Sequence, residues 1–278
     1  SDIDIEYVAD DSVEKLIKKQ NPLLWITGLW KQQNIESSVG VKYDKDKLAK
    51  VIENLDCMAE ENQIPSVSAK PEFTGEKFEV AAEQIGTAID KDKFAETVTK
   101  AINGFQSEVD LMKEDCYILP KYTKDSPEVA KACEKMNSEL GANITLDFSP
   151  NTEVVDSSVI SQWITVDDNM QVTFNQDAVK QYIADLAAKY DTVGKTRNFT
   201  TATGNVVQVE GGGYGWKIDQ DAEYNALITN IQNAETVTRE PNYSSRAATH
   251  DANDWGTTYA EVDLTAQHMY FIQNGQVA

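Results

Sequence analysis

Hydrophobic and polar positions recur in the same order in two parts of the chain. An alternating stretch followed by a stripe of apolar residues at helical spacing returns 131 positions later. This pattern predicts a short strand and then an amphipathic helix that buries one face. The matched positions are Val41, Tyr43, Asp44, Asp46, Leu48, Val51, Ile52 and Leu55 with Val172, Phe174, Asn175, Asp177, Val179, Tyr182, Ile183 and Leu186.

A second block recurs at a spacing of 129 positions, so a two-residue insertion separates the blocks. Trp30 and Trp163 correspond more weakly, at a spacing of 133. Repetition of this kind predicts two copies of one structural unit, at about 12–120 and 126–247. The matches in the second block are Gly75, Phe78, Val80, Gly86, Ile89, Asp90, Asp92, Val98 and Ile102 with Gly204, Val207, Val209, Gly215, Ile218, Asp219, Asp221, Leu227 and Ile231.

Each copy is expected to mix strands and helices. In the second copy the pattern predicts a strand at 171–174 and a helix to about Ala188, capped by Asn175 or Asp177. A strand pair is expected at 206–209 and 214–218, with three glycines bending the chain between them. An aspartate in 219–221 then caps another helix. Capping is favoured over a cation site because the Gly and Glu pattern of a calcium loop is missing.

The segments that flank the second copy have the composition of linkers. Residues 120–127 are rich in proline and polar side chains, and Ser126 with Pro127 predicts the start of a helix that ends at Gly141. A strand is expected at 143–148, then a strand and a short helix within 154–164. Residues 244–256 predict a second linker, followed by strands at 259–264 and 267–272 and a hairpin turn at Asn274 and Gly275.

The predicted fold class is therefore α+β, with two tandem copies of a mixed α/β module. The domain boundaries expected are 1–120, 121–247 and 248–278. The last segment is interpreted as a linker and the first β-hairpin of a further, truncated β-rich domain, because an isolated hairpin is only marginally stable in water.

Charge excludes two classes of partner. The chain has 25 basic and 46 acidic residues, a net charge of −21. A charge of this sign leaves no basic surface for nucleic acid, and an anionic membrane would repel the chain. The longest uncharged apolar stretch near the start is too short to span a bilayer, and the acidic first residues are unlike a signal peptide.

The sequence predicts no catalytic site. Cys57, Cys116 and Cys133 follow no metal-ligand spacing, and a bridge between Cys116 and Cys133 is possible but unsupported. Cys133 lies on the apolar stripe of its helix, where a buried small side chain is expected. We therefore predict no catalytic residue, no metal site and no cofactor.

Several motifs resemble the region that precedes the catalytic domain in L,D-transpeptidases of Gram-positive bacteria. The most specific is TYAEVDLTAQHM at residues 258–269, and GYGWKID at 213–219 and REP at 239–241 add to it. Trp163-Ile164-Thr165 and Tyr190-Asp191-Thr192 also match, and the resemblance spans about 23–278. In that family, mixed α+β modules regarded as peptidoglycan-binding precede a YkuD-type domain that cross-links wall peptides through an acyl-cysteine.

The resemblance implies a non-catalytic, extracellular region that positions the catalytic domain in the cell wall of a Gram-positive bacterium. The nucleophile of the L,D-transpeptidase family lies in a His-Gly-Cys motif beyond the strand that begins near Tyr259. The resemblance therefore implies no catalytic residue in this chain. Peptidoglycan is the expected partner, with no membrane contact by this segment, although the parent protein is expected to be anchored upstream. The alternative is a stand-alone module that binds wall glycan or peptide.

Three residues are candidates for contact with peptidoglycan. Tyr214 and Trp216 offer aromatic faces on which sugars stack, and Arg239 offers donors for polar groups of a stem peptide. The competing interpretation is structural, because alternation of Tyr214 and Trp216 around Gly215 predicts that one face of this segment belongs to the core.

Overall fold

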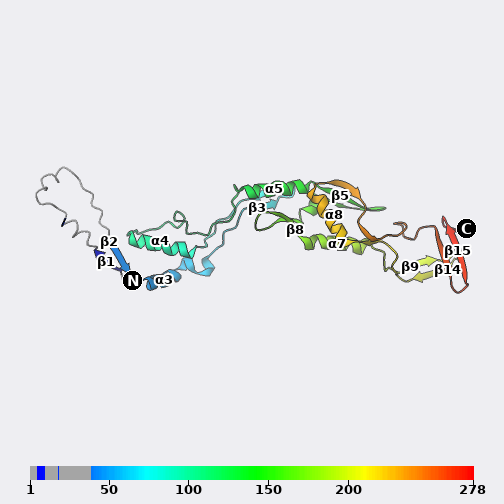
Figure 1. The fold of residues 1–278 in the computed structure, drawn as a ribbon, viewed down its shortest axis with the longest axis horizontal. Coiled ribbons are helices and arrows are strands. Elements are labelled where there is room, and N and C mark those ends of the chain that lie inside the picture. Colours follow the sequence, from blue (N-terminus) through cyan, green and yellow to red (C-terminus); the bar gives the residue numbers. More distant parts are fainter. Residues whose placement is uncertain (1–4, 10–17, 19–38) are drawn as a thin grey trace. The chain divides into compact units, whose positions relative to one another are not determined.

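The computed structural model describes residues 5–9, 18 and 39–278, and the chain divides into two compact units. Unit 1 comprises residues 1–69 and 82–123, and unit 2 comprises residues 70–81 and 124–278. Figure 1 shows helices and short strands in both units. The predicted mixed α/β fold is thus confirmed. Among the described residues, no helix is both long and apolar enough to cross a membrane.

Unit 1 is built around two amphipathic helices. Strands β1 (Ile5–Ala9) and β2 (Val39–Tyr43) pair antiparallel, and α3 (Lys45–Glu53) follows, then two single 3₁₀ turns and α4 (Lys91–Asn103). The 3₁₀ turns are Asp56–Met58 and Glu60–Asn62. The buried residues of its core are Leu48, Ile52, Met58, Ile89, Phe94 and Cys116.

Unit 2 has the larger core, which lies among three helices and a small sheet. Strand β12 (Thr236–Arg239) runs parallel to β5 (Asn143–Phe148), and β6 (Asn151–Val155) pairs antiparallel on its other side. Helices α5 (Pro127–Leu140), α7 (Gln176–Tyr190) and α8 (Gln220–Gln232) bury their apolar faces here. The remaining elements up to residue 245 are α6 (Ser157–Ile160), β7 (Ile164–Val166), β8 (Val172–Phe174), β9 (Arg197–Thr200), β10 (Val206–Val209), β11 (Lys217–Ile218) and β13 (Tyr243–Ser245).

A hairpin from the first sequence repeat belongs to unit 2. Strands β3 (Lys70–Phe73) and β4 (Phe78–Ala81) pair antiparallel and pack on α5. Asn137 on α5 accepts from the backbone N–H of Phe78 at 2.7 Å and donates to its carbonyl oxygen at 2.8 Å. The side chain of Phe78 is buried in the unit 2 core. The chain therefore crosses between the units at 69/70, 81/82 and 123/124.

The predicted repeat has a counterpart in backbone detail. A Cβ placed on Gly86 would come within 2.0 Å of the carbonyl oxygen of Ile64, and one on Gly215 within 2.6 Å of the backbone nitrogen of Val193. Both pairs are 22 residues apart and are related by the spacing of 129 positions. The same close backbone contact therefore occurs once in each repeat.

Helix caps also recur as expected. Asp44 caps α3 and Asn175 caps α7, each accepting a backbone N–H of the first turn. Asp90 and Asp219 cap α4 and α8 in the same way. The capping interpretation of these aspartates is confirmed, because their side-chain oxygens are the acceptors for the free N–H groups.

One predicted strand pairing is wrong. Strand β10 does not pair with residues 214–218; it pairs antiparallel with β9, and only the two residues of β11 are extended, paired with β13. The stretch at 197–200 alternates in burial and supplies the nearer partner across a short turn. Residues 211–213 lead the chain away from β10 instead. Gly211 passes so close to Gly194 that a Cβ on Gly211 would lie 1.9 Å from the carbonyl oxygen of Gly194.

The C-terminal strands form as predicted. Strands β14 (Tyr259–Asp263), β15 (His268–Gln273) and β16 (Gln276–Val277) make an antiparallel sheet. Asn274 and Gly275 have φ of 50° and 79°, the positive values that a tight hairpin turn of this kind requires. The helix from Pro127 to the C-cap Gly141 is also confirmed. The weaker Trp30 correspondence lies outside the described residues.

Candidate functional site

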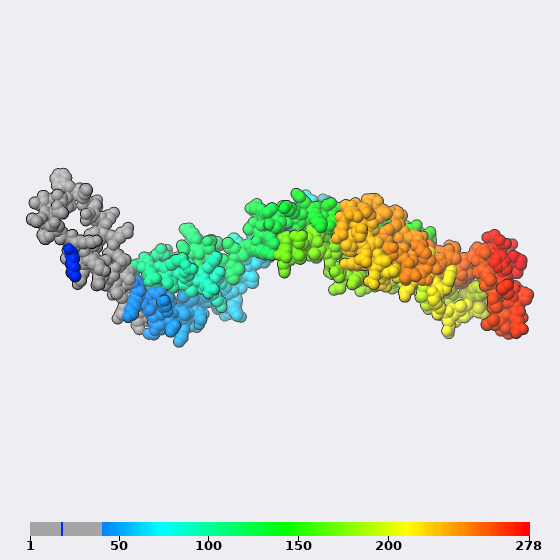
Figure 2. Space-filling model, in the orientation of Figure 1, coloured from blue at the N-terminus to red at the C-terminus, as the bar shows by residue number. Residues whose placement is uncertain are grey.

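A groove of about 400 Å³ lies in unit 2 between the β9–β10 hairpin, the glycine-rich loop after it and the segment that enters β14. Its volume falls within the range of small-ligand sites. Figure 2 shows the yellow hairpin at the surface near the orange and red C-terminal segment. Four aromatic side chains dominate the lining, which includes Phe199, Tyr214, Trp255, Tyr259, Arg197 and Glu210.

The aromatic wall follows from strand alternation and ring packing. Phe199 and Arg197 share one face of β9, and both are half-buried, whereas Asn198 and Thr200 on the other face are exposed. The Phe199 ring centroid lies 5.5 Å from that of Trp255 and 5.6 Å from that of Tyr259. Tilted and edge-to-face pairs at these distances are favourable aromatic geometries. The three rings therefore brace one another.

Arg197, one of the lining residues, forms an ion pair with Asp254. Arg197 donates from Nε to Oδ1 of Asp254 at 2.9 Å and from Nη2 to Oδ2 at 2.6 Å. Thr192 Oγ1 donates to the same Oδ2 at 2.6 Å. Burial alone would raise the pKa of Asp254, but the hydrogen bonds from Arg197 and Thr192 hold it below the usual value. The carboxylate is thus charged and occupied at neutral pH.

Residues 246–256 are tied to the body of unit 2. The Tyr214 hydroxyl donates to the Asp254 carbonyl oxygen at 3.0 Å and accepts from the Ala248 N–H at 2.9 Å. The Trp216 indole donates to the Thr249 carbonyl oxygen at 2.7 Å. Its ring stacks on His250, with centroids 3.8 Å apart and an interplanar angle of 7°. This segment, predicted to be part of a linker, is instead anchored at several points.

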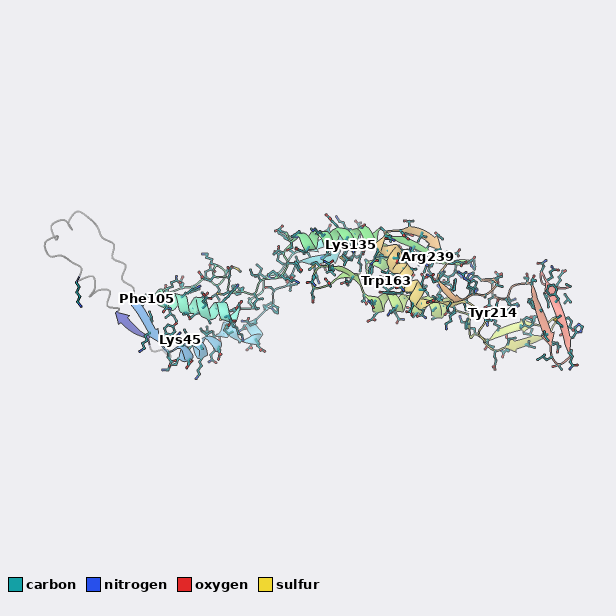
Figure 3. The ribbon with its side chains drawn as sticks, viewed as in Figure 1. Lys45, Phe105, Lys135, Trp163, Tyr214 and Arg239 are labelled. Carbon is teal, nitrogen blue, oxygen red and sulfur yellow. The ribbon has the colours of Figure 1, made fainter. Side chains whose placement is uncertain are left out.

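The three candidate contact residues do not form one site. Tyr214 lines the groove and is 45% exposed, whereas Trp216 is 7% exposed and is not among the lining residues. Arg239 also lies apart from the groove, and Figure 3 shows it away from Tyr214. The structure therefore brings only Tyr214 to the groove.

Arg239 serves an internal network. It donates from Nη1 and Nη2 to the two carboxylate oxygens of Glu223 at 3.0 and 2.9 Å, and from Nε to Asn230 at 3.1 Å. Glu223 is fully buried and also accepts from the backbone and side chain of Asn242. Charged side chains this deep in a protein are normally paired. This bidentate pair fastens the end of β12 to α8.

Sequence reasoning missed most of the groove. Trp255 stands in the polar, small-residue segment that predicts a linker, and the pattern around Phe199 predicts no strand. A lone tryptophan in a polar segment is itself a signal, because so large an apolar surface usually finds a partner. The contact with Phe199, 56 residues away, cannot be found from local periodicity.

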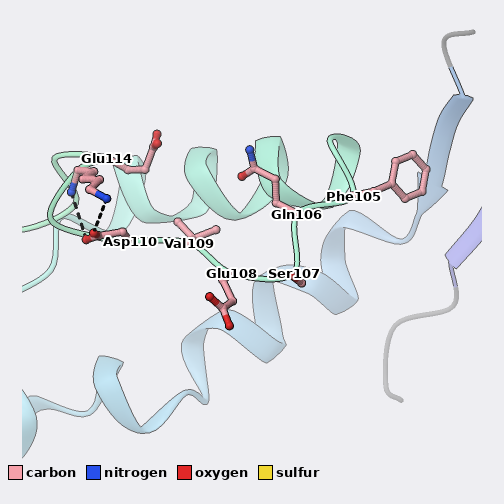
Figure 4. A pocket seen from close by; sticks show the side chains of 8 residues that line it. Phe105, Gln106, Ser107, Glu108, Val109, Asp110 and Glu114 are labelled. Atoms are coloured by element: carbon pink, nitrogen blue, oxygen red, sulfur yellow. Dashed lines mark hydrogen bonds and ion pairs between the residues drawn. The ribbon is translucent and has the colours of Figure 1, made fainter. Parts of the chain in front are cut away.

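Unit 1 contains a second hollow of about 480 Å³, drawn in Figure 4. All of its lining residues fall within 105–114, a single stretch of chain after α4. Asp110 caps the turn there, accepting from the Met112 N–H at 3.1 Å, and pairs with Lys113 at 3.5 Å. This hollow lacks a wall from a second element, so we take the groove of unit 2 as the candidate site.

The cysteines are all free and none lines the groove. Cys116 is buried and its thiol contacts Thr97 Oγ1 at 3.4 Å. The Cys133 thiol donates to the Phe78 carbonyl oxygen at 3.0 Å, and burial raises its pKa. A raised pKa disfavours the thiolate that a nucleophile needs. The geometry of Cys116 and Cys133 is that of packing residues.

Comparison with known families identifies both repeats. A family model described as "Putative peptidoglycan binding domain" matches residues 1–110 and again residues 122–239. The chain belongs to this family. The predicted peptidoglycan-binding region with two copies of one module is thereby confirmed. The groove combines Arg197 to Tyr214 of the second peptidoglycan-binding domain match with Trp255 and Tyr259, which follow it.

Two solved structures match about half of this chain. One is a cysteine-to-serine mutant of an Enterococcus faecium L,D-transpeptidase, with 32% identity over 52% of this chain and 58% of that chain, and a TM-score of 0.40. The other is the carbamoyl enzyme of Ldtfm with avibactam, with 31% identity over 54% of this chain and 58% of that chain, and a TM-score of 0.41. The match thus spans less than two thirds of either protein. A search of curated proteins finds no match.

Proposed function

We propose that this chain is the peptidoglycan-binding region of a cell-wall L,D-transpeptidase and that it holds a separate catalytic domain at its substrate. The observation that carries the proposal is the paired family match, which covers both repeats. The motif at residues 258–269, which resembles the entrance of the YkuD-type catalytic domain, supports the link to that enzyme class. The setting proposed is extracellular, in the wall of a Gram-positive bacterium.

The connection between the units supports a positioning role. The chain crosses between its units three times and leaves a hairpin of the first repeat in unit 2. The buried Phe78 side chain and both Asn137 hydrogen bonds hold this hairpin on α5 within unit 2. Such a connection suits a region that carries load between a wall contact and an enzyme.

The proposed division of labour makes this region itself non-catalytic. The Cys116 thiol contacts Thr97 and the Cys133 thiol donates to a backbone carbonyl, so neither has the base and orienting group of an activated nucleophile in the part of the chain that the structure describes. The proposed domain boundaries remain 1–120, 121–247 and 248–278 in sequence. The hairpin at 70–81 belongs to the first by sequence and to the second unit by packing.

Binding to purified sacculi tests the proposal. The chain is mixed with sacculi stripped of anionic wall polymers, and the bound fraction is measured after sedimentation at low and at moderate salt. We expect retention at low salt, and retention that persists at moderate salt would show that the contacts are mainly to uncharged groups, which salt does not screen. An unrelated protein of similar net charge is the control. No retention above that control at either salt concentration would reject peptidoglycan binding.

The enzymatic link is tested by the reading frame. We expect the coding sequence to continue after Ala278 into a β-rich domain with a His-Gly-Cys motif. A frame that lacks such a domain would remove the transpeptidase part of the proposal and favour a stand-alone wall-binding module.

A further inference from the structure

Peptidoglycan offers two chemically distinct ligands, neutral N-acetylated sugars along its glycan strands and charged stem peptides. The lining of the groove discriminates between them. Aromatic rings present flat apolar faces that match the C–H faces of pyranose rings, and four such side chains line this one groove. The wall is preorganised, because Phe199 is packed against both Trp255 and Tyr259 before any ligand arrives.

The basic residue of the groove is not available to a carboxylate ligand. Each nitrogen of Arg197 already donates to a protein oxygen: Nε and Nη2 to Asp254, Nη1 to the Lys195 carbonyl oxygen at 3.0 Å, and Nη2 also to the Thr192 carbonyl oxygen at 3.0 Å. Recognition of carboxylates relies on arginine forks that are free to pair. This fork is already paired within the protein.

The other charged lining residue is Glu210, an exposed carboxylate. Together with the chain's net charge of −21, it disfavours the acidic groups of a stem peptide. A carboxylate accepts hydrogen bonds from hydroxyl and amide N–H groups, both of which an N-acetylated sugar presents. A groove with an aromatic wall, no free cation among its described lining residues and one exposed acceptor thus favours a neutral, hydroxyl-rich ligand.

We propose that this groove binds N-acetylated sugar units of the glycan strand, with Trp255, Tyr259 and Tyr214 as stacking faces and Glu210 as a hydrogen-bond acceptor. This inference rests on the proposed function and specifies the part of peptidoglycan that unit 2 binds. The β9–β10 hairpin contributes Arg197, Phe199 and Val209 to the lining of the groove. Arg197, which lines the groove, and its partner Asp254 are positioning residues, because their polar atoms are occupied by each other.

Calorimetry with two defined probes tests the inference on the full chain. The probes are chitotetraose, a neutral oligomer of N-acetylglucosamine, and a lysine-containing stem tripeptide. We expect chitotetraose to bind and the tripeptide to bind at least about 10-fold more weakly. Trp255→Ala should weaken chitotetraose binding roughly 10-fold or more, because it removes a large aromatic face. Trp255→Phe should restore part of the loss, which separates stacking from misfolding.

Two further variants sharpen the result. Phe105→Ala removes an exposed aromatic ring in unit 1, at the other hollow, and should leave binding unchanged. Glu210→Gln keeps an acceptor and removes the charge, so it should change chitotetraose binding less than 3-fold (about 0.6 kcal/mol at 25 °C). The inference would be overturned if the tripeptide bound more tightly than chitotetraose, or if Trp255→Ala left chitotetraose binding unchanged.

Sacculi separate this inference from the proposed function. Amidase digestion removes the stem peptides and leaves glycan strands. Binding to intact sacculi together with binding to the digested glycan supports both statements. Binding to intact sacculi but not to the digested glycan or chitotetraose overturns the glycan inference and leaves the proposed function standing. Binding to neither material rejects the proposed function itself.

Discussion

Phe78 provides a sharp test of the hairpin exchange, because it belongs to the first repeat in sequence and to unit 2 in packing. Its side chain is 5% exposed and its ring lies 5.3 Å from that of Phe73. Replacing a buried phenylalanine by alanine typically costs about 3–5 kcal/mol through lost burial and the cavity left behind. In a domain of 150–250 residues each kcal/mol lowers Tm by about 2–4 °C, so Phe78→Ala should lower the Tm of unit 2 by roughly 6–20 °C.

Hydrogen exchange read by mass spectrometry assigns the loss to one unit. Peptides from α7 and α8 should lose protection in Phe78→Ala, while peptides from α3 and α4 should keep theirs. Val207→Ala is the matched control, since Val207 occupies the equivalent repeat position but is 42% exposed. The Val207→Ala substitution should change the free energy of unfolding by no more than about 0.5 kcal/mol. Loss of protection in α3 and α4 alone would refute the assignment of the hairpin to unit 2.

Three further predictions address unit 2. Arg239→Ala should destabilise the unit by about 3–5 kcal/mol in urea unfolding, because it strands the buried carboxylate of Glu223, and a loss under 1 kcal/mol would contradict this account. Gly215→Ala should cost more than about 1 kcal/mol in the same assay, since φ is +139° and a Cβ would meet a backbone nitrogen at 2.6 Å; unchanged stability would show that the backbone relaxes. Because the folded pKa of Asp254 is lowered, its contribution is present above about pH 4 and is lost as pH falls through that folded pKa. Asp254→Asn should therefore narrow the stability difference between neutral and acidic pH, and an unaltered pH profile would contradict the Arg197 pairing.

Repetition made much of the fold predictable. The helices around Leu48 and Ile183 and their caps could be located because amphipathic spacing and capping chemistry are local properties of a sequence. The C-terminal hairpin at Asn274 was predictable for the same reason, since its turn needs positive φ at two adjacent positions. These features depend on neighbours within a few residues.

Long-range partners could not be predicted in the same way. The hairpin at 70–81 packs against α5, which is more than 45 residues away, and no periodicity shows which unit a strand pair will join. The pairing of β10 with β9 was missed because the strand at 197–200 is short and mostly polar. Local pattern indicates which face of an element is apolar, and tertiary packing selects the partner of that face.

The candidate site shows the same limit. Tyr214 was identified from its aromatic surroundings, and the groove does contain it. Trp216 has the same chemistry two residues on, yet its indole is stacked on His250 and donates to Thr249, so its face is already occupied. Arg239 is likewise occupied by Glu223. Residue type indicates what a side chain can bind, and only the fold determines whether another part of the protein binds it first.

The most direct test of the account is an NMR titration of the isotope-labelled chain with peptide-free glycan strands. The account predicts shift changes concentrated at the amides of Phe199, Glu210, Tyr214, Trp255 and Tyr259, with the α3 and α4 amides unmoved. Shift changes confined to unit 1, or a spectrum that stays the same at saturating glycan, would contradict it.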